Sequence, residues 1–206
     1  MKCREGTVVD ADDLIDEMLS IAKQKTEERG KVKDFAEEEL KNLYETIGLG
    51  ALKFFLLRVD PKKRIVFNSE ESIDFHGFTG PFIQYTYARI KSILRKVDDK
   101  WQLTVADGAS SVESRQPLML LEKQLLIQSE QFPSIIEEAA ASYDPSKIAI
   151  YIFDLAKIFN SFYAEHSIAN AETAEKKILR LQLASVTAGV LKKGMSLLGI
   201  NVPERM

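Results

Sequence analysis

The chain has 206 residues, is 45% hydrophobic and 29% charged, and carries a formal net charge of −3, which is typical of a globular protein with one or two domains. No apolar run approaches the ~20 residues of a membrane-spanning helix, and the first residues lack the apolar segment of a signal peptide. Cys3 is the only cysteine, which excludes an internal disulfide and a zinc site built of cysteine and histidine. We therefore expect a cytoplasmic protein that binds no metal and does not contact a membrane.

Two helices are predicted in the first 48 residues. Asp10 or Asp12 can cap the first helix, and Gly30 is expected to end it. Residues 32–48 continue with helical spacing of apolar side chains. The denser apolar stretch at residues 50–60 predicts either a buried helix or a strand.

Residues 64–75 hold the best strand candidates, "RIVFN" and "SIDF", because both are short and contain β-branched and aromatic residues. Thr79 is then expected to cap a helix that has Pro81 in its first turn and runs to about Lys96. The polar residues 97–115 predict a long loop. From residue 116 onward the spacing is helical again, so the expected fold is mainly α, a helical bundle with a small β element near residues 64–75.

The predicted helix at residues 79–96 has four basic and no acidic side chains. One of its faces has the spacing of a buried stripe and consists of Ile83, Tyr87, Ile90 and Leu94. Phe82, Tyr85 and Arg89 share another face. Aromatic rings beside a cation can stack on bases and bind phosphate, or they can pack against a neighbouring helix, and the pattern leaves both interpretations open.

Four stretches have a recognisable pattern: "MKCREGTVVDADDLIDEM", "GPFIQYTYARIKSILRK", "FNSFYAEHSI" and "LGINVPERM". In this order they resemble four parts of the arginyl-tRNA synthetases, which are class I aminoacyl-tRNA synthetases. These parts are the "KMSKS" loop in the form "KM-x-[ST]-R-x-G", the motif "TGPYIQY-x-H-AR-x-x-SI" that begins the helical anticodon-binding domain, a later "FN-x-FY" helix, and a C-terminus that usually stops at a methionine. The resemblance covers nearly the whole chain.

The resemblance implies a division into residues 1–78, with the loop and a connecting region that contacts the tRNA stem, and residues 79–206, the anticodon-binding domain. A full-length parent would attach arginine to its tRNA using ATP and Mg²⁺. Arg4 in the loop would stabilise the pyrophosphate leaving group. The nucleotide-binding fold with its "HIGH" signature has no counterpart, so we expect this chain alone to be inactive and to hold no cofactor.

The resemblance also implies an arginine tRNA as the partner of a monomeric chain. The residues that it assigns to tRNA binding are Phe82, Tyr85, Arg89, Asn160, Tyr163 and Met206. Aromatic side chains would hold unstacked anticodon bases, and cations would bind phosphates. Phe82 stands where the family usually has tyrosine and Tyr87 where it has histidine, while the usual "GNTGP" reads "GFTGP"; stacking is retained at Phe82 but a hydroxyl contact is lost.

Two other classes of function are compatible with parts of the pattern. A helical protein–protein adaptor without RNA binding would use the helix at residues 172–206 as its partner surface. An RNA binder differs from it in losing affinity with salt, with a slope of about −0.7 per phosphate contact for single strands. A metal enzyme could use Asp10, Asp12, Asp13 and Asp16, but the dipole of a helix explains acidic residues in its first turns.

Overall fold

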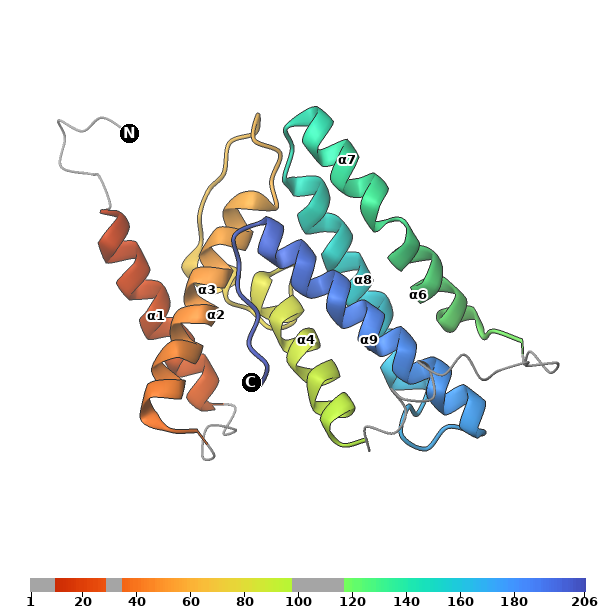
Figure 1. Ribbon diagram of the computed structural model, residues 1–206. Coiled ribbons are helices and arrows are strands. Elements are labelled where there is room, and N and C mark those ends of the chain that lie inside the picture. Colours follow the sequence, from red (N-terminus) through yellow and green to blue (C-terminus); the bar gives the residue numbers. More distant parts are fainter. Residues whose placement is uncertain (1–9, 29–34, 98–116) are drawn as a thin grey trace.

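The computed structural model describes residues 10–28, 35–97 and 117–206 (Figure 1). The described residues form α-helices and no strand, which confirms the mainly α prediction. The helices are α1 (Ala11–Glu28), α2 (Glu37–Leu57), α3 (Ser69–Ser72), α4 (Gly80–Arg95), α6 (Leu120–Glu130), α7 (Phe132–Ser142), α8 (Ser146–Glu165) and α9 (Ala174–Leu197). No helix in the described parts of the chain is long and apolar enough to cross a membrane.

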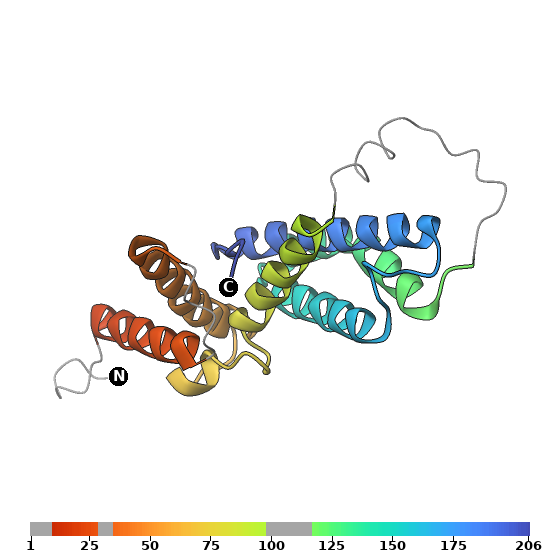
Figure 2. The same cartoon turned by 90° about the horizontal axis from the view of Figure 1, so that it is seen from below.

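Helices α1 and α2 pack along each other at one end of the molecule (Figures 1 and 2). Of the two alternatives for residues 50–60, the buried helix is correct, but it continues the preceding helix instead of starting anew. Gly48 and Gly50 do not break α2 because each is a point of close contact. A Cβ at Gly48 would lie 3.1 Å from the Met18 carbonyl oxygen in α1.

The structure corrects the prediction of a small β element near residues 64–75. Residues 64–68 form no strand, and Ser69–Ser72 form the short helix α3. The Asn68 side chain accepts a hydrogen bond of 3.0 Å from the Glu71 backbone N–H, which starts this helix. Val66 is 88% exposed, so β propensity there is not supported by burial or by a partner strand within the described residues.

Helix α4 lies between the α1–α2 pair and the group formed by α6, α7, α8 and α9 (Figure 2). The Thr79 side chain accepts from the Phe82 backbone N–H at 3.3 Å and caps the helix, as predicted. The expected core stripe is buried at its first three positions, Ile83, Tyr87 and Ile90. Helix α4 thus contacts both parts of the molecule, and its side chains that are not in these contacts lie between the two parts.

Residues 199–206, which we call the tail, turn back along α4 after α9 (Figure 1). Gly199 has φ +68°, a left-handed conformation that favours glycine. The Gln84 amide in α4 donates to the carbonyl oxygens of Thr46 in α2, at 2.9 Å, and of Asn201 in the tail, at 2.8 Å. One side chain of α4 thus connects α2 and the tail.

Candidate nucleic-acid interface

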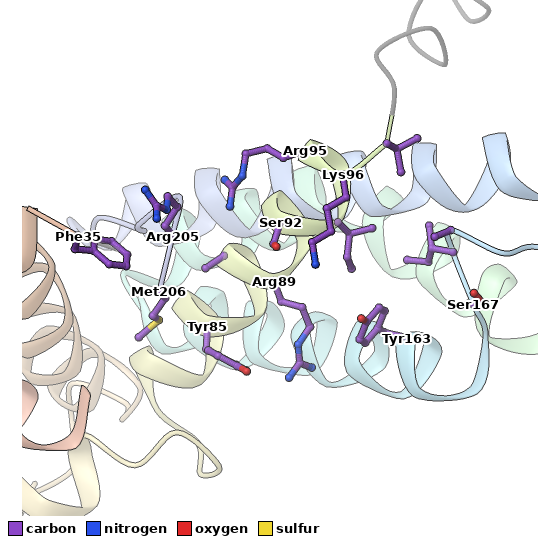
Figure 3. A pocket seen from close by; sticks show the side chains of 15 residues that line it. Phe35, Tyr85, Arg89, Ser92, Arg95, Lys96, Tyr163, Ser167, Arg205 and Met206 are labelled. Carbon is purple, nitrogen blue, oxygen red and sulfur yellow. The ribbon is translucent and has the colours of Figure 1, made fainter. Parts of the chain in front are cut away.

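A groove of about 960 Å³ runs along α4, between the end of α8 and the tail (Figure 3). Tyr163 and Ser167 lie toward one end of it, and Phe35, Arg205 and Met206 lie at the other. Its cationic side chains are Arg89, Arg95, Lys96 and Arg205, and none of the described residues that line it is acidic. The groove therefore combines aromatic rings with positive charge, a composition suited to single-stranded nucleic acid.

Arg89 lies between two tyrosines at the centre of the groove. Its guanidinium carbon is 4.8 Å from the centre of the Tyr85 ring and 5.5 Å from that of Tyr163, at cation–π distances. Tyr163 is 40% exposed and also stacks on Phe159, with ring centres 6.4 Å apart and planes 9° apart. Because the Tyr163 ring is held by these contacts and is still partly exposed, it can stack on a base without first being ordered.

Asn160 fixes Arg89 from α8. Its side-chain oxygen accepts a hydrogen bond of 2.6 Å from the Arg89 guanidinium, and its amide nitrogen donates to the Thr86 hydroxyl at 2.8 Å. Asn160 does not line the groove. The structure therefore gives this predicted binding residue a positioning contact, in which it fixes the plane of the guanidinium that faces the groove.

Phe82 also lies outside the groove. Its ring packs against Phe153 of α8, with 5.1 Å between ring centres, and it belongs to the partly buried layer around the large hydrophobic core. The packing interpretation of the aromatic face of α4 is thus correct for Phe82, whereas Tyr85 lines the groove and its stacking on a base stays a prediction. The absence of a hydroxyl at position 82 accords with this packing role.

The structure brings together four of the predicted tRNA-binding residues in one groove: Tyr85, Arg89, Tyr163 and Met206. Sequence reasoning missed Phe35, whose ring lies 4.5 Å from the Arg205 guanidinium carbon, because no local pattern connects α2 with the tail. Arg95 and Lys96 were counted among the basic residues of this helix but were not assigned to tRNA binding. Arg4 lies outside the described residues, as does most of the predicted loop at residues 97–115.

The acidic side chains at the start of α1 were also considered as metal ligands. Among the described residues, no group of three or more histidine, cysteine, aspartate or glutamate side chains is arranged to hold a metal ion. The Asp10 side chain instead accepts a 3.2 Å hydrogen bond from the Asp12 backbone N–H at the start of the helix. This contact is the N-terminal capping expected of such residues.

Comparisons with known proteins agree with this arrangement. Residues 83–206 match the family described as DALR anticodon binding domain, and residues 1–68 match tRNA synthetases class I (R), catalytic domain. The arginine--tRNA ligases of Flavobacterium psychrophilum and Amoebophilus asiaticus are 52% and 47% identical over the whole chain, which covers 33% and 34% of their lengths. The chain thus spans about a third of the length of the curated relatives that it matches.

Solved structures give the same result. The arginyl-tRNA synthetase of Thermus thermophilus is 29% identical with a TM-score of 0.82, and the match covers 98% of this chain and 33% of that one. For the enzyme of Plasmodium falciparum the identity is 28%, the TM-score 0.82, and the coverage 97% and 34%. These matches favour a synthetase over a helical adaptor. The chain belongs to the arginyl-tRNA synthetase family and carries its DALR anticodon binding domain.

Proposed function

We propose that the groove along α4 binds the anticodon loop of an arginine tRNA. The observation that carries this proposal is the position of Arg89 between Tyr85 and Tyr163, in a groove whose described lining residues include no acidic side chain. Protein surfaces that hold unpaired bases use aromatic rings for stacking and cations for phosphates. Both chemical groups occur here within one groove.

The proposed division of labour follows the positions of the side chains. Tyr85 and Tyr163 stack on bases, Arg89 contributes hydrogen bonds and charge beside them, and Met206 provides an apolar contact at the opposite end. Asn160 acts through Arg89, and Phe82 acts by packing. Arg95, Lys96 and Arg205, which line the groove, would contact phosphates.

We further propose that the chain serves an arginine–tRNA ligase, as the names of its relatives indicate. Residues 1–78 would be the part that connects catalysis to the tRNA stem, and residues 79–206 the anticodon-binding domain. The complete enzyme would couple arginine to tRNA with ATP and Mg²⁺, with Arg4 at the phosphates, in the cytoplasm. The chain alone would bind tRNA as a monomer without aminoacylating it.

The test is a titration of the purified chain with two RNAs that differ only in the anticodon. One is an arginine tRNA, and the other is the same tRNA with its anticodon bases replaced. We expect tighter binding of the first RNA. The logarithm of its binding constant should fall linearly with the logarithm of the salt concentration. Equal affinity for both would contradict anticodon binding, and no binding of either would favour a protein–protein adaptor.

A further inference from the structure

Three side chains of α4 hold one residue of the tail. The Tyr87 hydroxyl donates to the Glu204 carboxylate at 2.8 Å, and the Lys91 ammonium lies 3.2 Å from the other carboxylate oxygen. The Arg95 guanidinium donates to the Glu204 backbone carbonyl at 2.9 Å. Residues four and eight positions apart form one row along a helix, so α4 presents a continuous row of donors to Glu204.

Arg205 and Met206, the two residues after Glu204, both line the groove. The Arg205 guanidinium lies over the Phe35 ring of the α2 region. Met206 packs against the small hydrophobic core that includes Met18, Leu43 and Ile47 and that Phe35 and Tyr85 also border. Neither Arg205 nor Met206 belongs to a helix, so their positions depend on what holds the tail.

We propose that Glu204 is a positioning residue, which fixes the tail on α4 and thereby places Arg205 and Met206 in the groove. The effect of Glu204 on tRNA affinity rests on the proposed function. The position of the tail on α4 does not, because it is a property of the chain without RNA. Tyr87 and Lys91 are the partners through which Glu204 acts. One helix thus has two roles, because the row with Tyr85 and Arg89 faces the groove while the row with Tyr87 and Lys91 holds the tail.

The protonation states suit this contact. Burial and, next, the hydrogen bond to Glu204 raise the pKa of Tyr87 above its ordinary value, so its hydroxyl remains a donor at neutral pH. Partial burial works against ionisation of Glu204, but the hydrogen bonds from Tyr87 and Lys91 and nearby lysine charges outweigh it and lower its pKa. At neutral pH the carboxylate is therefore charged and accepts from both partners.

The central test is the variant Glu204→Gln, which keeps the size of the side chain. We expect affinity for an arginine tRNA to fall about tenfold, because hydrogen bonds to a charged group are among the stronger ones. Loss of a negative charge near RNA would by itself raise the affinity. A decrease in affinity would therefore indicate that Arg205 and Met206 are no longer held in place. Tyr87→Phe, which removes only the hydroxyl, should lower affinity in the same direction.

A second set of variants tests whether Glu204 acts on tRNA affinity through Arg205 and Met206. In an Arg205→Ala/Met206→Ala chain, Glu204→Gln should cause no further loss of tRNA affinity, since nothing remains for it to position. An equal loss of tRNA affinity in both backgrounds would overturn the proposal. Urea unfolding should remain a single cooperative transition in Glu204→Gln, because the side chain is 52% exposed.

A measurement without RNA separates this inference from the proposed function. In a chain with ¹³C-labelled methionine methyl groups, the Met206 signal should move to the position of a mobile, solvated methionine in Glu204→Gln. If Met206 moves but no variant changes tRNA affinity, the tail inference stands and the proposed function fails. If the Met206 signal stays unchanged, the tail does not depend on Glu204 and the inference is wrong.

Discussion

Phe82 and Tyr85 lie one turn apart on α4 but have different surroundings. Phe82 packs against Phe153 of α8, whereas Tyr85 lines the groove and contacts Arg89. A helical wheel places both residues on the same side of α4, because it contains only the helix's own geometry. The difference comes from α8, about 70 residues further along the chain, so it could not be predicted from the local sequence.

Phe82→Ala should therefore act on stability. We expect the free energy of unfolding in urea to fall by about 3 kcal/mol, as is typical when an aromatic side chain is removed from a packed site. At a temperature where the variant remains folded, its affinity for an arginine tRNA should be close to that of the original chain. A normal unfolding midpoint combined with weaker tRNA binding would show that Phe82 contacts the RNA after all.

At the scale of elements, α6 and α9 are joined by buried charges. The Glu122 carboxylate, 0% exposed, lies 2.6 Å from the Lys176 ammonium and 3.0 Å from Nε of Arg180, and it accepts from the Met119 backbone N–H at 2.9 Å. Arg180 also donates to the Ser167 carbonyl oxygen between α8 and α9 at 2.7 Å. More than fifty residues separate Glu122 from both cations, so their pairing could not be predicted from helical spacing.

Glu122→Gln should lower the free energy of unfolding by about 3–5 kcal/mol at pH 7, because it leaves the buried Lys176 ammonium without a carboxylate and the buried Arg180 guanidinium with Glu172 alone. Burial works against ionisation of Glu122, but its hydrogen bonds from Lys176, Met119 and Arg180 lower its pKa below 4.5. A lowered pKa stabilises the folded chain above pH 4.5, and this contribution is lost as the pH falls through the lowered value.

Urea unfolding of both chains between pH 7 and pH 3 measures this effect. The difference between the original chain and Glu122→Gln should narrow as the pH falls, since protonation of Glu122 removes the charge that the variant lacks. A difference that stays constant down to pH 3 would mean that the carboxylate contributes through its shape and not through its charge.

At the scale of the whole molecule, glycines set the distance between the α1–α2 pair and α4. A Cβ at Gly80 would lie 2.7 Å from the Gly50 carbonyl oxygen, so α2 and α4 are in close backbone contact. The sequence alone could not identify this contact, because it depends on which helix packs opposite Gly50.

Gly80→Ala should lower the free energy of unfolding by about 1–3 kcal/mol, the usual cost of adding atoms to a filled space. Gly189→Ala is the matched control. It lies within α9 with no atom within 4 Å of the added Cβ, and it should raise stability by about 1 kcal/mol through helix propensity. If Gly80→Ala also stabilised the chain, the close contact of α2 and α4 would not exist in solution.

The sequence predicted those parts of the molecule that local chemistry determines. The capped start of α4 at Thr79 follows from a single residue whose side chain can accept a backbone hydrogen bond. Residues 64–68 were predicted incorrectly, because β propensity becomes a strand only where a partner strand is present. In the groove, Tyr85 and Arg89 could be named from the sequence, whereas Phe35 could not, because the tail must fold back before the two meet.

The central claim is that the groove along α4 binds the anticodon loop. Its most direct test compares the affinity of an arginine tRNA anticodon stem-loop for Tyr163→Ala and for Tyr143→Ala, with urea unfolding of both. Tyr163 is the exposed tyrosine of the groove, and Tyr143, 88% exposed at the end of α7, does not line it. Tyr163→Ala should weaken binding by about 1–3 kcal/mol, the loss expected for one base–aromatic stack, while Tyr143→Ala leaves it unchanged. Equal affinities for the two variants would contradict the claim.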